Sequence, residues 1–378
     1  MSWHEHPKSI GLLCSGFGLG FYIPGLLIQA TLRRLGIATH VEVFETAMSQ
    51  EKIGQVEKAR TAYHDNFKVA LASQRVPSDI TQSLDEKRVA ALLTRWRNAR
   101  VRDFICMSGH WVFVLDRYRA EIDYPIRVHL LHLDADLTPS WRQLKRIHPH
   151  YAQPYEEVKL YDGAALQVMQ CIDANAGPVV PYSERNSRLV VHGGGWGMGT
   201  FQEAVPRLES AGFGLDIACY GPVAAGVRAT NRRYFMDDPS WRTWHRNAAG
   251  EHTFPRFAEI KQAPADFRSQ SQCHGLHRII RHARAIVSKP GAGTLVDSFA
   301  SATPLVMLEP FGEHEARNAA VWRTSGFGID YHEWAAAGHP LASLQELHRN
   351  LLEHRTRVPD YAQRFAALFR QDHGGRSS

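Results

Sequence analysis

The feature that most constrains the fold is a glycine-rich segment that occurs twice in the chain. Gly16 to Gly20 reads Gly-Phe-Gly-Leu-Gly, and Gly195 to Gly199 reads Gly-Trp-Gly-Met-Gly. Each copy follows a short apolar run and precedes a helical pattern, so each predicts a strand, a tight turn and a helix. This is the opening unit of a doubly wound α/β domain. The two copies therefore predict two such halves.

The N-terminal half continues the alternation of strands and helices. A predicted strand at 10–14 leads to a helix at 25–35 and to a second strand at 38–44. Residues 49–100 carry Lys, Arg, Glu and Gln at regular intervals, which is typical of helices. The chain therefore opens with the β-α-β arrangement of a parallel sheet.

Two further strands of this half end at polar residues. Apolar runs at 103–107 and 127–133 are followed by His110 and by Asp134 and Asp136, respectively. Ligands bind outside the carboxyl ends of the strands in open α/β sheets. We therefore expect these three side chains to face a cleft.

The C-terminal half repeats this design. Its predicted elements are, in chain order, strands at 188–192, 214–220 and 285–287, a helix at 294–301 and a strand at 304–308. Residues 222–255 are rich in Pro, Asn, Arg and Trp and match neither pattern. Two helices, at 341–354 and 361–369, end the chain, and the second is apolar enough to pack back on the N-terminal half.

A chain of 378 residues is too long for one ordinary core and suits two domains. The stretch 178–186 is rich in Pro, Ser and Asn and is the natural linker between them. We predict an N-terminal domain at 1–183 and a C-terminal domain at 184–378. Two domains also predict a cleft between them.

Charge and cysteine content narrow the class of protein. The net charge of +6 comes from 44 Lys and Arg against 38 Asp and Glu, without a long basic run. This disfavours nucleic-acid binding and still allows a basic cleft for phosphate. The five cysteines lie far apart and form no Cys-x-x-Cys pair, which predicts free thiols in a reducing, cytoplasmic compartment.

An uncharged stretch at 10–32 is long enough to reach across a bilayer. It contains five glycines and Pro24, and it divides into a strand, a glycine turn and a helix. We therefore expect membrane contact to be peripheral at most. The sequence predicts no oligomeric state.

The 21 histidines raise the question of a metal site. His129 and His132 lie on a predicted strand, where positions three apart face opposite sides. His274 and His277 can share a helical face, but the sequence places no carboxylate or third histidine at ligand spacing near them. We expect no metal and no other cofactor.

The segment 286–300 has the features of a diphosphate cradle. A strand delivers the chain to small residues, and Gly291 and Gly293 let the backbone approach a ligand. Thr294 then opens a helix, whose free amides and positive end would face a diphosphate. The following loop at 310–318 adds Glu, His and Asn side chains that can fix sugar hydroxyls.

From about Arg188 to Asp330 the chain resembles the donor-binding half of glycosyltransferases with the B fold. It especially resembles the peptidoglycan N-acetylglucosaminyltransferase, diacylglycerol glycosyltransferases and antibiotic glycosyltransferases. The likeness rests on the segments Ser288-Lys-Pro-Gly-Ala-Gly-Thr-Leu, Ala300-Ser-Ala-Thr-Pro304 and Pro310-Phe through Asn318-Ala. It implies an α/β fold of two facing Rossmann-like, doubly wound domains with an interdomain cleft.

The resemblance also implies where a nucleotide sugar binds. Asp297 matches a position that is usually Glu and holds the ribose hydroxyls, and His314 and Glu315 match two polar positions, commonly Asp-Gln, that hold the sugar. The predicted donor site consists of Gly194, Gly195, Gly197, Ser288, Gly291, Ala292, Gly293, Thr294, Asp297, Glu313, His314, Glu315 and Asn318.

The N-terminal half resembles the acceptor domain of the same enzymes through its glycine loop and the Tyr-Ile-Pro-Gly sequence that follows. The predicted acceptor loop comprises Gly18, Gly20, Phe21 and Tyr22. Relatives usually have a histidine before the proline, which some use as the catalytic base, and this chain has Phe21 near that place.

The missing histidine leaves the base to be found by elimination. His110 is the first candidate, because it follows a strand end and an unperturbed imidazole titrates near neutrality. Asp134 and Asp136 are the alternatives.

Together these features predict a glycosyltransferase of the hexosyltransferase class, acting in natural-product or cell-envelope glycosylation. It would move a sugar from a nucleoside-diphosphate sugar, UDP-linked by resemblance, to a small-molecule or lipid-like acceptor, with inversion and without metal. Its partners would be the nucleotide sugar and an unidentified acceptor. Two alternatives remain: a nucleotide-sugar epimerase of the same fold, and a non-catalytic nucleotide-sugar-binding protein.

Overall fold

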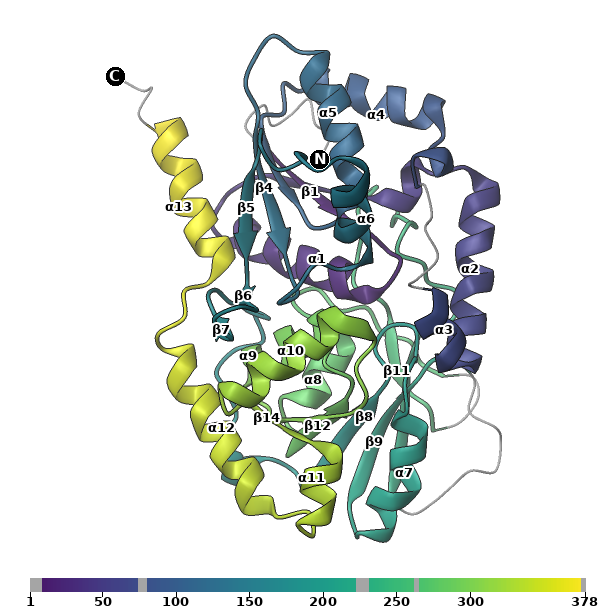
Figure 1. Ribbon diagram of the computed structural model, residues 1–378, viewed down its shortest axis with the longest axis vertical. Coiled ribbons are helices and arrows are strands. Elements are labelled where there is room, and N and C mark those ends of the chain that lie inside the picture. The colour runs from purple at the N-terminus through teal and green to yellow at the C-terminus, as the bar shows by residue number, and fades with distance from the viewer. Residues whose placement is uncertain (1–8, 74–79, 222–230, 262–264, 375–378) are drawn as a thin grey trace.

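The computed structural model describes residues 9–73, 80–221, 231–261 and 265–374. Two separate sheets face each other across the molecule, one from each half of the chain (Figure 1). The N-terminal sheet has the strand order β2-β1-β3-β4-β5, and all its pairings are parallel. Its strands are β1 (Ile10–Cys14), β2 (Thr39–Val43), β3 (Asp103–Cys106), β4 (Arg127–His132) and β5 (Glu156–Lys159). The strand order reverses between β1 and β3, which makes this a topological switch point.

The C-terminal sheet has the order β11-β10-β9-β8-β12-β13-β14, and β10 and β11 are its antiparallel pair. Its strands are β8 (Arg188–His192), β9 (Gly214–Cys219), β10 (Arg232–Asp237), β11 (Phe257–Glu259), β12 (Ala285–Ser288), β13 (Leu305–Met307) and β14 (Gly328–Asp330). Without the edge strand β11, this is the 3-2-1-4-5-6 order of a dinucleotide-binding sheet. Its switch point lies between β8 and β12.

Helices flank both sheets. Those of the N-terminal half are α1 (Leu19–Arg34), α2 (Gln50–Asp65), α3 (Phe67–Ser73), α4 (Glu86–Asn98), α5 (Val112–Ala120) and α6 (Pro139–Ile147). Those that follow are α7 (Phe201–Ser210), α8 (Gly275–Ile280), α9 (Ala292–Ser301), α10 (Gly312–Thr324), α11 (Tyr331–Ala336), α12 (Leu341–Arg355) and α13 (Tyr361–Gly374). A small hairpin, β6 (Tyr161–Asp162) and β7 (Gln167–Val168), lies between the halves in the chain.

The predicted strands at 10–14 and 188–192 are confirmed to the residue, but the prediction for the first helix was wrong at its start. Helix α1 begins at Leu19, six residues before the predicted Gly25. The predicted start left out the residues around Pro24. Pro24 lies early in α1, where it removes only the bond to the Gly20 carbonyl.

The prediction of a loop at 310–318 was also wrong, because most of this segment forms the first turns of α10. Its polar residues hide the helical pattern until Val321 and Trp322, both fully buried, extend it. Of the unassigned segment 222–255, residues 222–230 lie outside the described residues, and β10 occupies part of the remainder.

The segment between β10 and β11 crosses from the C-terminal sheet to the N-terminal half. The Tyr22 hydroxyl donates to the Thr253 carbonyl oxygen at 2.8 Å, and Arg246 pairs with the buried Glu42 at 2.9 Å. These contacts join the halves on the side of α1.

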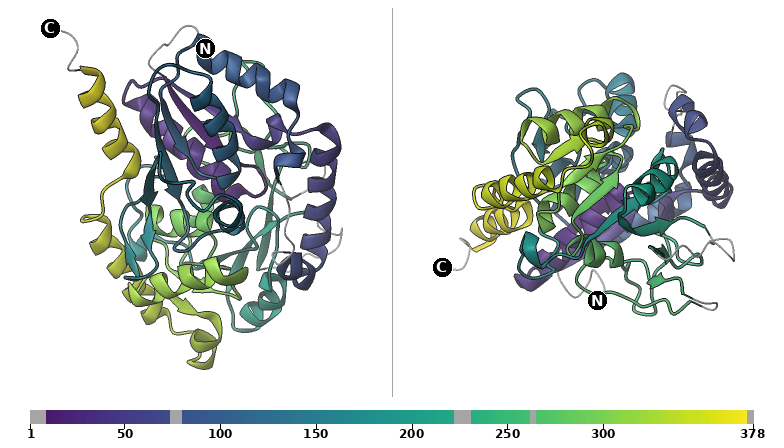
Figure 2. Two further views of the ribbon diagram at one scale, coloured as in Figure 1. Left: turned by 45° about the horizontal axis from the view of Figure 1, so that its top comes forward. Right: turned by 90° about the horizontal axis from the view of Figure 1, so that it is seen from below.

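The last helix also joins the halves. Helices α12 and α13 run along the outside of both sheets, and α13 packs against α1 (Figures 1 and 2). Tyr361 and Phe365 of α13 are buried beside the ring of His129 on β4. The two sheets lie on either side of residue 183 in the chain, and the exact domain boundary remains a prediction.

Within the described residues, no helix combines the length and the apolar character needed to cross a membrane. The uncharged stretch 10–32 instead forms β1, the glycine turn and most of α1.

Candidate functional site

A cavity of about 1130 Å³ lies between the two halves at both topological switch points. Its lining includes Ser15 and His110, which follow β1 and β3, and His192 and Lys289 at the ends of β8 and β12. Ligands of open α/β sheets bind at such points, because the loops on either side leave in opposite directions and open a crevice. Here two such crevices face each other and form one cavity.

Two helix N-termini meet at this cavity. Helix α1 starts after Gly18 and α9 after Gly291, and neither of these N-cap glycines supplies a side-chain hydrogen bond. The two first turns touch, since a Cβ atom on Gly293 would lie 3.7 Å from Gly20 Cα. The first amides of a helix have no partner within the helix and carry partial positive charge. Two such ends line one cavity and turn their unpaired amides towards it, an arrangement that can bind an anion.

Lys289 brings an ammonium group to this end of the cavity. Its ammonium forms a buried ion pair with Glu315 and lies 5.8 Å from the centre of the Phe311 ring. The other Glu315 carboxylate oxygen accepts the Phe311 backbone N–H at 2.7 Å. Sequence reasoning passed over Lys289, although it lies within the glycine motif itself.

The structure divides the predicted sugar-binding residues into three groups. His314 and Glu313 line the cavity at the start of α10, with His314 buried and Glu313 exposed and paired with Arg142. Glu315 lines it too but is engaged by Lys289. Asn318 is fully buried and lies outside the lining.

Asn318 joins the two halves at the cavity edge. Its Oδ1 accepts the Ala135 backbone N–H at 2.8 Å, and its Nδ2 donates to Asp134 Oδ1 at 2.7 Å and to the Pro290 carbonyl at 2.9 Å. Both polar atoms of the amide are therefore engaged between β4 of one half and the glycine motif of the other.

The second glycine turn follows β8. Gly194 and Gly197 have φ values of +73° and +58°, which favour glycine, and the Gly194 amide donates to His192 Nδ1 at 3.1 Å. A Cβ atom on Gly195 would lie 2.4 Å from Leu19 Cγ, so this glycine permits close packing on α1. Gly194 and Gly195 line the cavity, while the Gly197 carbonyl lies 2.9 Å from His64 Nδ1 of α2.

The remaining residues of the glycine motif differ in their access to the cavity. Gly291, Ala292, Gly293 and Thr294 all line it from the first turn of α9. Ser288 is fully buried, and its hydroxyl oxygen lies 3.4 Å from His192 Nδ1. Ser288 is therefore placed behind the cavity wall.

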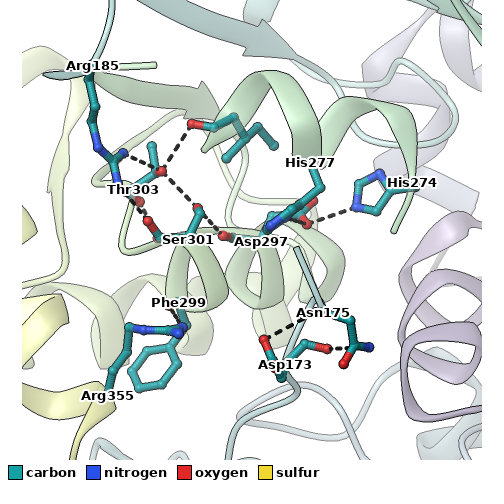
Figure 3. A network of polar contacts seen from close by, with 12 residues as sticks. Asp173, Asn175, Arg185, His274, His277, Asp297, Phe299, Ser301, Thr303 and Arg355 are labelled. Atoms are coloured by element: carbon teal, nitrogen blue, oxygen red, sulfur yellow. Dashed lines mark hydrogen bonds and ion pairs between the residues drawn. The ribbon is translucent and has the colours of Figure 1, made fainter. Parts of the chain in front are cut away.

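Asp297 is held by two histidines (Figure 3). His274 Nε2 and His277 Nδ1 each lie 2.8 Å from Asp297 Oδ1, and all three side chains are buried. Burial alone would raise the pKa of Asp297, but the charges and hydrogen bonds of the two imidazoles hold it well below its usual value. Burial opposes the charged form of His274, and the Asp297 carboxylate outweighs this and raises the His274 pKa.

These partners correct one step of the sequence interpretation. No carboxylate was found at ligand spacing from His274 and His277 in the sequence, yet folding brings Asp297 of α9 against both. The spacing of residues along the chain carried no signal for this contact.

The candidate bases at the end of β4 lie in different environments. Asp134 is buried and lines the cavity, and burial raises its pKa, while the charge of His314 and the Asn318 hydrogen bond act in the opposite direction. Asp136 is exposed, lies outside the lining and pairs with Arg142 at 2.8 Å.

His110 lines the cavity at the end of β3, in a short 3₁₀ turn at Gly109–Trp111. Its ring packs against Phe17 and Phe44, with ring centroids 5.3 and 5.1 Å away, and Nδ1 has no partner among the described residues. Burial lowers its pKa to about 4. The expectation of a near-neutral pKa was therefore wrong, because the two phenyl rings exclude the water that would stabilise an imidazolium.

The predicted acceptor loop forms the first turn of α1. Gly18, Gly20 and Phe21 line the cavity, whereas Tyr22 is fully buried and faces Thr253.

The rim beside the second glycine turn contains further cationic and aromatic residues. Arg60 of α2 lies 4.7 Å from the Tyr220 ring centre, and the Tyr63 and Trp196 rings lie 5.7 Å apart. All four line the cavity. Helix α2 of the N-terminal half thus covers the donor-half loops from outside.

The comparisons with known proteins bear on the fold. Neither a family model nor a curated protein matches the chain in sequence. The glycosyltransferase SnogD from Streptomyces nogalater is 16% identical, with 96% of this chain and 99% of that chain covered and a TM-score of 0.53. SsfS6 of Streptomyces sp. SF2575, solved with thymidine diphosphate, has 12% identity, the same coverage and a TM-score of 0.56. Acinetobacter baumannii MurG has 12% identity, the same coverage and a TM-score of 0.50.

This chain therefore has the B fold of glycosyltransferases, with two facing Rossmann-like domains and a cavity between them. The predicted fold class is confirmed. At these identities the likeness establishes the fold, and the activity has to be argued from the site.

Proposed function

We propose that this chain transfers a sugar from a nucleoside-diphosphate sugar, with UDP as the nucleotide, to an acceptor bound by the N-terminal half. One observation carries the proposal: two uncapped helix N-termini and the buried ammonium of Lys289 line a single cavity. A diphosphate matches this combination of free amides and one cation. SsfS6, a neighbour in structure, was solved with thymidine diphosphate, which is a ligand of the same chemistry.

The reaction is displacement at the anomeric carbon. The bond from that carbon to the diphosphate oxygen breaks with its electron pair leaving on the diphosphate, and a new bond forms to the acceptor oxygen or nitrogen. The first amides of α1 and α9 together with Lys289 would stabilise the departing negative charge, and they are already oriented before the reaction. Attack from the opposite face inverts the configuration.

The acceptor proton is assigned to Asp134. This carboxylate lies at the end of an N-terminal strand and lines the same cavity as His314, on the predicted sugar side. His110, the first candidate from the sequence, is a poor base at neutral pH, since burial lowers its pKa to about 4, whereas burial raises the pKa of Asp134. Domain contacts at Asn318 would hold Asp134 in place against the donor half.

Thermal unfolding with nucleotides tests donor binding. UDP should raise the melting temperature, since a ligand that binds only the folded state stabilises it, with TDP, ADP and GDP as comparisons. A larger rise in melting temperature with TDP than with UDP would change the assigned nucleotide from UDP to TDP, while the diphosphate site would stay as proposed. If none of the four raises the melting temperature, the diphosphate site is wrong.

Product analysis then tests the reaction. Purified protein is incubated with UDP-sugars and a panel of hydroxyl and amine acceptors, and mass spectrometry detects new glycosides. We expect a glycoside and free UDP in equal amounts. A donor whose sugar changes configuration without acceptor would indicate an epimerase, and a donor that binds but stays intact would indicate a binding protein.

A further inference from the structure

We propose that His274, His277 and Asp297 form a binding site for a divalent transition-metal ion, Zn²⁺ in the first place. The three ligand atoms, two imidazole nitrogens and one carboxylate oxygen, lie within 4.8 Å of one another. Two imidazoles with one carboxylate are a common donor set for Zn²⁺ and for Fe²⁺. The inference does not depend on the proposed sugar transfer.

The helices hold the three side chains in a convergent arrangement. His274 is the N-cap residue of α8, and His277 lies three positions later on the same face of its first turn. Both rings point at Asp297 on the neighbouring helix α9, as Figure 3 shows. The α9 backbone is fixed there, because the Ser301 hydroxyl donates to the Asp297 carbonyl at 2.6 Å.

Two of the three separations between ligand atoms are known and can be compared with those of a filled site. In a tetrahedral Zn²⁺ site with bonds of about 2.0–2.2 Å, neighbouring ligand atoms lie about 3.3 Å apart. The two nitrogens now lie 2.8 Å from Asp297 Oδ1. All three atoms lie within 4.8 Å of one another, so the side chains would have to move until each pair of ligand atoms is about 3.3 Å apart to admit the ion. Each nitrogen would then give up its proton to solvent and use its lone pair as a ligand.

A third buried histidine borders this cluster. His192, at the end of β8, is also buried, and its Nε2 has no partner among the described residues. Its imidazole is close enough for the charges of Asp297 and His274 to act on it. The Gly194 amide donates to His192 Nδ1, so the neutral ring carries its proton on Nε2, and His192 borders the cluster as an N–H donor and not as a further ligand.

The position of the site suggests what the ion would contact. His274 and Asp297 line the cavity, so an ion bound there would be reached from it. Zn²⁺ with three protein ligands keeps one coordination position for water or a ligand oxygen. A hydroxyl or phosphate oxygen of a molecule in the cavity can take that position.

The test uses the full chain without an affinity tag, stripped with a chelator and titrated with ZnCl₂ against a chromophoric chelator. We expect one tight Zn²⁺ per chain, and Co²⁺ at the same site should give the visible absorption of tetrahedral coordination. His277→Gln keeps a group that can donate to Asp297 but is a poor metal ligand, and it should weaken binding by about 100-fold or more. His282→Gln is the matched control, since His282 is exposed just after α8.

Several results would overturn the site. Equal affinity in His277→Gln and wild type, or loss in His282→Gln alone, would place the ion elsewhere on the surface. If the wild type does not bind Zn²⁺ tightly, His274, His277 and Asp297 are joined by hydrogen bonds only and the metal site is wrong. If His277→Gln does not fold by circular dichroism, His274→Gln gives the same reading. Because no nucleotide is present in the titration, failure of the metal site and failure of UDP binding are separate results.

Discussion

The two halves of the cavity treat their buried ionisable side chains differently. In the C-terminal half five of them are paired, Lys289 with Glu315 and Asp297 with His274 and His277, although His192 Nε2 and His314 Nδ1 have no partner among the described residues. In the N-terminal half, His110 has no partner for Nδ1, and one oxygen of Glu45 has none among the described residues. A paired group stays charged when buried, while an unpaired one shifts towards its neutral form.

The difference suggests that the C-terminal side of the cavity binds the donor and the N-terminal side binds the acceptor. Charged groups that are already held in place suit binding of a charged donor, because little reorganisation is needed when the ligand arrives. Neutral groups around His110 suit an apolar or uncharged acceptor. Asp134 lies between the two environments: it belongs to the N-terminal sheet but is held by Asn318 of the other half.

The largest expected effect is loss of the base. Asp134→Asn keeps the oxygen that accepts from Asn318 but cannot take a proton, and it should lower turnover by about 10²–10⁴-fold with little change in donor affinity. Asp136→Asn, an exposed neighbour outside the cavity, is the control. For His110→Gln, steady-state kinetics should show that turnover falls by less than about tenfold. If His110→Gln lowered turnover more than Asp134→Asn, His110 would be the catalytic base instead of Asp134.

The next effect tests the pairing of charges in the C-terminal half. Lys289→Met leaves the Glu315 carboxylate buried without its cation and should cost about 3–5 kcal/mol of unfolding free energy. The double variant Lys289→Met with Glu315→Gln should recover most of this stability but not UDP affinity. Denaturant unfolding measures the free energy of unfolding, and calorimetry measures the UDP affinity. Normal UDP affinity in the double variant would give Lys289 a purely structural role.

The smallest effect concerns a buried carboxyl in the N-terminal half. Burial raises the pKa of Glu45 from 4.5 to about 7, against the opposing hydrogen bond from the Gly16 amide. The folded protein therefore holds an extra proton between these values and loses stability as the pH rises through them. Glu45→Gln is neutral throughout and should be more stable than wild type at pH 8, by at most about 3 kcal/mol, but not at pH 5.

Urea unfolding at both pH values measures this difference. Glu51→Gln, at an exposed position on α2, serves as the control and should behave as wild type. If Glu45→Gln were more stable than wild type by the same amount at pH 5 and pH 8, the gain in stability would not come from removing the charge of Glu45.

Local patterns in the sequence were enough for the framework. The strands at 10–14 and 188–192 are short apolar runs that end at glycines, and a run of this kind is buried wherever the sheet forms. The glycine motif around 291–293 likewise predicted the uncapped start of α9, because small residues and the helical pattern lie next to each other in the chain.

Contacts between distant segments were decided only by the tertiary structure. Asp297 lies 20 residues from His277, and Asn318 lies 184 residues from Asp134, yet these pairs set the charge and position of the groups in the cavity. His110 follows a strand as predicted, but the rings that lower its pKa come from Phe17 and Phe44 on other elements. Periodicity encodes which face of an element is buried, and the pKa of a side chain depends on what is buried against that face.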